Sequence, residues 1–189
     1  MDLTPATAEP GGNEELIRLI GERAADLFAS GQMLCTSAVL SALNQGLGGG
    51  LDPELVLRLA GGLYQGLGGA GCLCGAVSGG NLALGLFLGN GKRNGRGARR
   101  LAAAARCLHD DFKASLGSTC CRVLTKKVKH DNKLHTAQCA GLSSLAAELA
   151  ARLILAQRPE LAQGADLEYL LQKEPKTSGL QRVLGAIGS

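Results

Sequence analysis

An uncharged stretch of 33 residues, from Leu59 to Gly91, most constrains what this 189-residue chain can fold into. Twelve of those residues are glycine. The most apolar part, Leu82 to Leu88, is far shorter than the roughly 20 residues that cross a bilayer. We therefore expect a buried core segment here and no stable membrane span.

Helical periodicity surrounds this stretch, and no segment alternates with the period of two that is typical of a strand. Asn13 followed by two glutamates, and Asp52 followed by Pro53, are good helix starts. The pattern predicts an all-α fold: a compact bundle of about six to seven helices with a Gly-rich loop, Gly66 to Cys74, before a buried central helix. The expected helices cover residues 13–31, 32–45, 53–64, 75–88, 97–116, 118–129 and 136–157, with a short one at 166–173.

Three regions are predicted along the chain. Residues 1–12 form a flexible N-terminal lead-in, 13–158 the helical domain that carries the cysteines, and 159–189 a partly helical C-terminal extension. The lead-in is acidic and has no apolar core. We therefore expect no signal peptide and a cytoplasmic location. In a reducing compartment, seven cysteines favour metal binding or redox chemistry over a disulfide framework.

Charge and composition exclude several classes of function. The net charge of +4 and an aromatic content of 3% are too low for a dedicated nucleic-acid binder. The basic loop Lys92 to Arg100 is interpreted as a solvated turn, with a patch for an anion or a partner as the alternative.

An acid–base enzyme is the weakest class. No P-loop, nucleophile elbow or dinucleotide fingerprint occurs, and the three histidines are scattered. His109, His130 and His135 are each expected at the surface. His135 has an alternative reading as a replacement ligand or proton partner, because Cys139 follows four residues later.

Most of the cysteines fall near predicted helix starts. Cys35 lies one turn into its helix and Cys74 directly precedes the central helix, while Cys120 and Cys121 follow the candidate cap Ser118. Cys139 follows the candidate cap Thr136 in the same way. Free backbone N–H groups and the positive helix end lower the pKa of a thiol, which suits both a redox thiol and a metal cluster. Cys107 sits mid-helix and is expected to be a small buried apolar residue.

The spacing of the cysteines argues against two cofactors. Structural zinc sites usually show two C-x2-C pairs, whereas this chain has C-x-C, an adjacent pair and single cysteines. No C-x-x-C-H occurs, so covalently attached haem is not expected.

The cysteines occur in a recognisable order. Cys35 lies in GQMLCTSAVL, Cys74 to Gly79 reads CGAVSG, GSTCCRVL holds Cys121, and Cys139 opens the last long helix. From Leu27 to Leu155 the chain resembles the C_GCAxxG_C_C family, which is named for its cysteine pattern and described as redox-active. CGAxxG is the most specific part of the resemblance.

The resemblance implies one site formed by four cysteines: Cys35, Cys74, Cys121 and Cys139. Cys121 matches the family pattern better than its neighbour Cys120 does. A related domain forms the N-terminal part of split-Soret cytochromes, where it is associated with an iron–sulfur centre. The chain departs from the pattern by adding Cys72, Cys107 and Cys120, and by its basic insertion.

We therefore expect an electron-transfer protein whose four cysteines bind an iron–sulfur cluster, with [2Fe–2S] favoured and no haem. Two alternatives stay open. One is a cofactor-free thiol–disulfide protein, in which Cys72 with Cys74, or either of them with Cys121, cycles between dithiol and disulfide. The other is a module that binds or carries a soft metal. Cys72 and Cys120 are candidate additional thiols of the site. The expected partner is an unidentified redox protein. A homodimer is compatible with the uncharged helix, as is burial inside a monomer.

Overall fold

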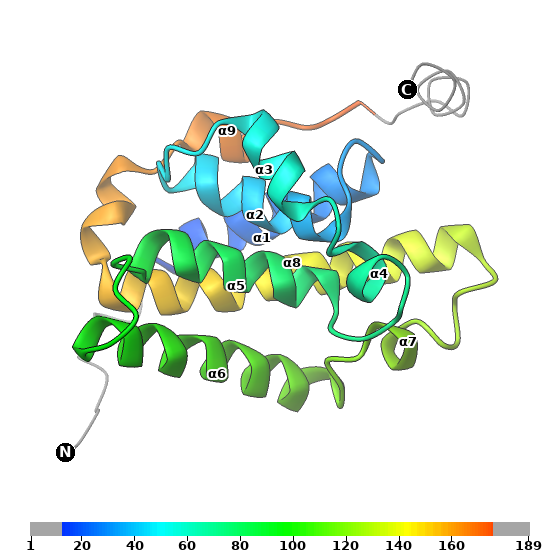
Figure 1. Ribbon diagram of the computed structural model, residues 1–189. Helices are drawn as coiled ribbons and strands as arrows, with labels where there is room; N and C mark the ends of the chain where they lie inside the picture. The colour runs from blue at the N-terminus through cyan, green and yellow to red at the C-terminus, as the bar shows by residue number, and fades with distance from the viewer. Residues whose placement is uncertain (1–12, 176–189) are drawn as a thin grey trace.

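The longest helix, α8 (Asn132–Gln157), organises the fold of the protein. The computed structural model describes residues 13–175, and in this range α8 contacts α1, α2, α5 and α6 (Figure 1). Fully buried alanines at 146, 147, 150 and 151 let these neighbours approach α8 closely. The other elements are α1 (Glu14–Ala29), α2 (Cys35–Gly46), α3 (Pro53–Ala60), α4 (Tyr64–Leu67), α5 (Gly75–Leu88), α6 (Arg96–Leu116), α7 (Cys121–Leu124), the 3-10 helix η1 (Pro159–Gly164) and α9 (Leu167–Leu171).

The all-α prediction is confirmed, since residues 13–175 contain helices and a single isolated β-bridge but no strand. Among the described residues, α4 in the Gly-rich region and η1 after α8 were not expected, whereas the short helix expected at 166–173 is present as α9. The lead-in 1–12 and residues 176–189 lie outside the described range. Part of the predicted extension packs on the main bundle, where Tyr169 and Leu170 are buried against the core.

Four predicted helix boundaries are wrong. Helix α3 ends at Ala60 rather than near Tyr64, where the separate helix α4 begins. Helix α2 begins at Cys35 rather than Gln32, and the segment expected to be helical over 118–129 contains only the single turn α7 before a series of turns. Helix α8 begins at Asn132 rather than near Thr136, because the Asp131 carboxylate accepts hydrogen bonds from the N–H groups of Lys133 and Leu134. Asn13 precedes α1 but makes no side-chain capping bond.

Helix α8 is also long and apolar enough to cross a membrane by length and composition. Half of its most apolar part is buried inside the bundle, and the buried core helix of a soluble protein passes the same test. The helix is therefore weak evidence for a membrane span.

Two glycines of α5 explain how it packs against α2. A Cβ at Gly79 would lie 2.5 Å from the Thr36 carbonyl oxygen and 2.9 Å from the Cβ of Val39. A Cβ at Gly75 would collide with the Cys35 sulfur. The four-residue glycine spacing therefore marks close helix packing, as predicted, for these two positions. Gly71, the third, lies instead in the loop before α5 with a φ of +75°.

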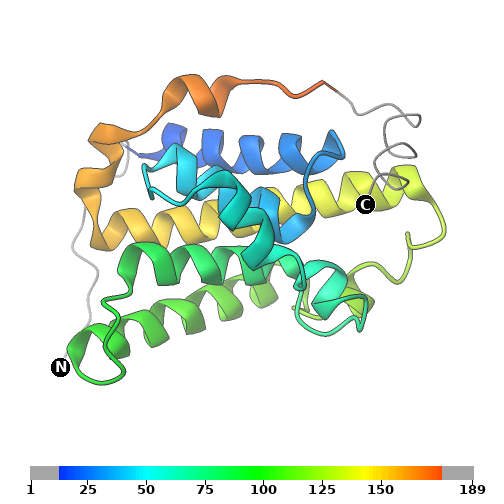
Figure 2. The same cartoon turned by 45° about the horizontal axis from the view of Figure 1, so that its top comes forward.

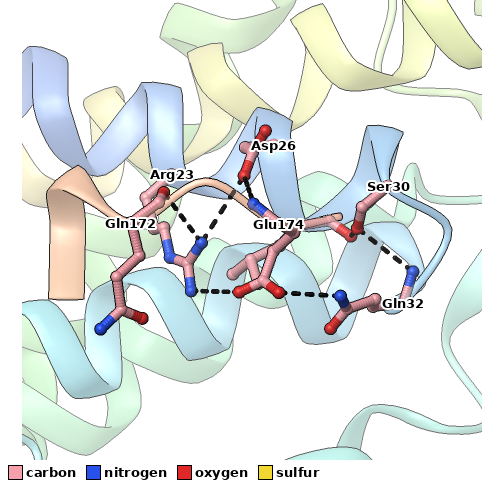
Figure 3. A network of polar contacts seen from close by, with 7 residues as sticks. Arg23, Asp26, Ser30, Gln32, Gln172 and Glu174 are labelled. Atoms are coloured by element: carbon pink, nitrogen blue, oxygen red, sulfur yellow. Dashed lines mark hydrogen bonds and ion pairs between the residues drawn. The ribbon is translucent and has the colours of Figure 1, made fainter. Parts of the chain in front are cut away.

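The C-terminal segment crosses over α1 and α2 (Figure 2) and is held there by a buried arginine (Figure 3). Arg23 is 2% exposed, and its guanidinium donates to the carboxylate of Glu174 at 2.6 Å and to the carbonyl of Gln172 at 3.2 Å. It also lies 4.5 Å from the ring centroid of Tyr169. Glu174 in turn donates its N–H to Asp26. One buried cation thus connects α1 to the tail.

Substitution of Gly79 provides a first test of the packing. Gly79→Ala should lower the free energy of unfolding by about 1–3 kcal/mol, because α5 must move away from α2. Gly85→Ala, on the same helix where a Cβ meets nothing within 4 Å, should leave stability equal or higher by about 0.5–1 kcal/mol. Urea unfolding measures both, and equal effects would contradict the packing described here.

Arg23→Ala should destabilise the protein by on the order of 3 kcal/mol, because it leaves the largely buried Glu174 carboxylate without its cation. Arg18→Ala, on the same helix, is the matched control: Arg18 pairs with Glu15 and Glu22 in solvent, so its loss should change stability little. Thermal unfolding would distinguish them. A mild Arg23 variant would show that the tail is held by other contacts.

Candidate functional site

A pocket of about 190 Å³ gathers four thiols from distant parts of the chain. Its lining includes Cys35, Cys74, Cys121 and Cys139 together with His135. The volume is below the roughly 300–1,000 Å³ of sites for drug-sized ligands, so the pocket suits a small group. We call it the thiol pocket; Phe28, Leu34, Tyr64, Gln65, Gly75, Ala76 and Leu142 complete it.

Cys35 and Cys74 meet because α2 and α5 start at the same place. Cys35 is the first residue of α2, and Cys74 directly precedes α5. The missing Cβ of Gly75 leaves the space that the Cys35 sulfur occupies. The CGAxxG element therefore supplies the Cys74 thiol itself, and its Gly75 leaves space for the Cys35 thiol.

A short antiparallel contact attaches the Gly-rich loop to the adjacent-cysteine segment. Leu73 and Cys120 form the isolated bridge, with the N–H of Cys74 bonded to the Thr119 carbonyl at 2.7 Å and the N–H of Cys121 bonded to the Cys72 carbonyl at 2.9 Å. These bonds bring Cys121 beside the start of α5. The Cys120 thiol donates a hydrogen bond to the Gly71 carbonyl at 2.9 Å. Its hydrogen is therefore used in a contact with the Gly-rich loop.

The remaining wall of the pocket comes from α8. Cys139 is buried, and the Nε2 atom of His135, one turn earlier, lies 3.7 Å from its sulfur. The side chain of Gln138 donates to the Leu124 carbonyl and so ties α8 to α7. His135 is half-buried in the pocket rather than at the surface as expected, whereas His130 is exposed. His109 is half-buried on α6, where its Nε2 atom lies 3.3 Å from the Thr119 hydroxyl.

Burial dominates the acidity of these thiols. It raises the pKa of Cys74 to about 12, although the backbone N–H groups of Ala76 and Val77 act in the opposite direction. It also raises the pKa of Cys139 to about 12 and that of Cys121 above its usual value, with further increases from the neighbouring cysteines. The prediction that helix starts lower these pKa values is therefore wrong for the protein without a bound cation.

The mutual effects also show that the four thiols lie close together. The negative charges of Cys35, Cys74 and Cys121 each raise the pKa of Cys139. A cation placed among them would reverse this balance, because it stabilises all the thiolates at once.

The structure corrects two expectations about individual cysteines. Cys139 is the eighth residue of α8 rather than part of its first turn, so free N–H groups of the helix end do not reach it. Cys107 is exposed, not buried. The reason is that α6 packs through Ala104, Leu108 and Phe112, and Cys107 lies off that face.

The two additional thiols, Cys72 and Cys120, lie beside the pocket without lining it. Cys72 is exposed and Cys120 is half-buried. Within residues 13–175, no three His, Cys, Asp or Glu side chains are grouped so as to hold a single metal ion.

Sequence reasoning missed Tyr64 and Gln65, which line the pocket from α4. Gln65 has a φ of +48°, a left-handed conformation that a non-glycine residue adopts at a cost. No sequence signal marks either residue, since the strain arises from the tertiary contact of the loop.

The protein is thus an all-α bundle in which four cysteines line one small pocket. The family model of the C_GCAxxG_C_C family, described as a putative redox-active protein, matches residues 33–153, and the chain belongs to this family. The match lies within the resemblance from Leu27 to Leu155. No curated protein and no solved structure matches the chain.

Thiol labelling should reveal the electrostatics of the site. In reduced, metal-free protein at pH 8, iodoacetamide should modify the exposed Cys72 and Cys107 first and Cys74 and Cys139 last. Burial and a pKa of about 12 leave little thiolate on the latter two at this pH. Peptide mass spectrometry measures the order. Labelling of Cys74 as fast as that of Cys107 would show that the N–H groups of α5 outweigh burial.

Proposed function

We propose that the protein is an electron-transfer protein in which Cys35, Cys74, Cys121 and Cys139 hold an iron–sulfur cluster, with [2Fe–2S] favoured. The observation that supports this most directly is that all four cysteines of the family pattern line one pocket. A cluster bound there would supply one-electron redox chemistry.

The donor set supports a cluster. Four thiolates are the usual ligands of iron–sulfur clusters, and the four thiols share one pocket. A soft-metal module would use the same thiolates and stays an alternative.

The residues around the thiols would assist such a group in separate ways. The N–H groups of Ala76 and Val77 favour the thiolate of Cys74, and the Thr125 hydroxyl opposes part of the rise that burial causes in the pKa of Cys121. Phe28, Leu34 and Leu142 are apolar parts of the pocket lining. His135 stands next to Cys139, where it can exchange a proton with that sulfur or act as a substitute ligand.

A cofactor-free thiol–disulfide protein is the second candidate. It is favoured by the bridge that places Cys72 beside Cys121, both of them free thiols. Oxidation would join two sulfurs and release two protons and two electrons to a partner disulfide, which becomes a dithiol. The raised pKa of Cys121 works against this reading, because the attacking species is the thiolate.

The deciding measurement is the iron and acid-labile sulfide content, with a visible spectrum, of protein purified without oxygen. About two irons and two sulfides per chain would support the cluster. Zinc or copper without sulfide would favour the soft-metal module. No metal, together with a loss of two free thiols on oxidation, would favour the thiol–disulfide protein.

Single serine substitutions test the ligand set. Cys35→Ser, Cys74→Ser, Cys121→Ser and Cys139→Ser should each lose most of the iron and the visible absorbance, because each removes one thiolate. Cys107→Ser, whose thiol is exposed on α6, is the control and should keep both. Cys120→Ser should also keep them. Loss of iron in Cys120→Ser but not in Cys121→Ser would move the ligand by one residue.

A further inference from the structure

Large apolar side chains are exposed on the elements that carry the residues of the thiol pocket. Leu34 lines the pocket, Leu73 pairs with Cys120, and Val123 follows Cys121 by two residues. Leu134 precedes His135, and Leu67 belongs to α4, which contacts α7. Figures 1 and 2 both place α4, α7 and the first turns of α8 at one end of the bundle. We call this surface the pocket face: Leu34, Leu67, Leu73, Val123 and Leu134.

Leu67, one of these residues, has a strained backbone conformation. Leu67 is 60% exposed and has a φ of +66°, in the left-handed region that leucine rarely adopts. Burial cannot compensate for this strain, because most of the side chain is in solvent. Strained residues gather at binding sites, where the backbone geometry itself serves the function.

Positive charges adjoin the apolar residues. From α7 to the first turn of α8, five exposed cationic side chains occur with one carboxylate, Asp131, which caps α8. Within residues 13–175 none of the four lysines among them forms an ion pair. These cationic residues are Arg122, Lys126, Lys127, Lys129 and Lys133.

We propose that the pocket face and its lysines form the docking surface for an acidic redox protein. This inference rests on the proposed electron-transfer function and adds the partner to it. The exposed apolar side chains of the pocket face would exclude water between the two proteins, while the lysines would attract and orient a negatively charged partner. One electron then passes from the reduced partner to the site, which oxidises the partner, and no bond forms or breaks.

The charge of the surface argues against two other occupants. A second copy of the chain would bring the same lysines against each other, which opposes a dimer through this face. An anionic lipid surface usually binds one amphipathic helix, whereas the pocket face is assembled from α4, a loop, α7 and the beginning of α8. An acidic protein would complement the positive charge of the pocket face and could fit its irregular shape.

The test uses a small acidic ferredoxin as the probe and a basic cytochrome c as the opposite-charge control. Lys126→Glu/Lys127→Glu should weaken ferredoxin binding and slow electron exchange by roughly tenfold or more at low ionic strength. Added salt should reduce the difference between this variant and the wild type. Arg93→Glu/Arg96→Glu makes the same change in charge where the α5–α6 loop meets the first residue of α6, at the far end of the bundle. This variant should change ferredoxin binding and electron exchange by less than about twofold.

Leu67→Gly tests the apolar part independently of folding. Glycine adopts a φ of +66° without strain, so the variant should be as stable as the wild type or more so while it binds the ferredoxin less tightly. Unchanged binding would show that the apolar side chain plays no part in docking and would overturn that part of the proposal.

Three results would overturn the docking surface as a whole. They are equal losses in the two charge-reversal variants, no loss in either, and tighter binding of cytochrome c than of ferredoxin to the wild type. Binding to vesicles of phosphatidylcholine with phosphatidylserine that depends on Lys126 and Lys127, without ferredoxin binding, would assign the face to a membrane instead. Ferredoxin affinity measured with Cys121→Ser separates the docking proposal from the cluster proposal. Docking should persist in this variant even when the cluster is lost.

Discussion

The close approach of α5 to α2 is the contact on which the site depends. It requires that Gly75 and Gly79 have no side chain, because the sulfur of Cys35 and the carbonyl of Thr36 occupy the space that a Cβ would need. Once the two helices start side by side, Cys35 and Cys74 share one wall of a pocket, and α8 contributes Cys139 to its lining. The packing of α5 against α2 therefore also brings the cysteines of the pocket together.

Burial and function oppose each other in this pocket. Burial raises the pKa values of Cys74, Cys121 and Cys139, and the neighbouring cysteines raise them further. Without a bound cation, these three thiols are therefore stabilised in the protonated form. A positively charged group bound among them would turn the same repulsion into attraction, which links occupancy of the site to its protonation.

Much of the fold was predictable because its causes are local. Helical periodicity, Pro53 after Asp52 and the glycines around α5 each determine structure within a few residues. The predicted start of α8 near Thr136 is wrong because the Asp131 carboxylate, which was not considered as a cap from the sequence, accepts hydrogen bonds from the free N–H groups of the first turn. The grouping of Cys35, Cys74, Cys121 and Cys139 could be inferred from the family pattern alone, since sequence spacing does not reveal contacts between distant segments. Tyr64 and Gln65 gave no signal, because their place depends on how the loop folds back on α7.

The order of the cysteines along the chain has a consequence for how the protein is made. Cys35 and Cys139 are separated by 104 positions, and the wall that carries Cys139 belongs to the last long helix. A nascent chain that has emerged from the ribosome only as far as α7 exposes three of the pocket's thiols without the helix that covers them. Any group destined for the pocket must be delivered after translation has passed α8, so until then the unfinished site depends on the cell to protect its thiols from oxidation.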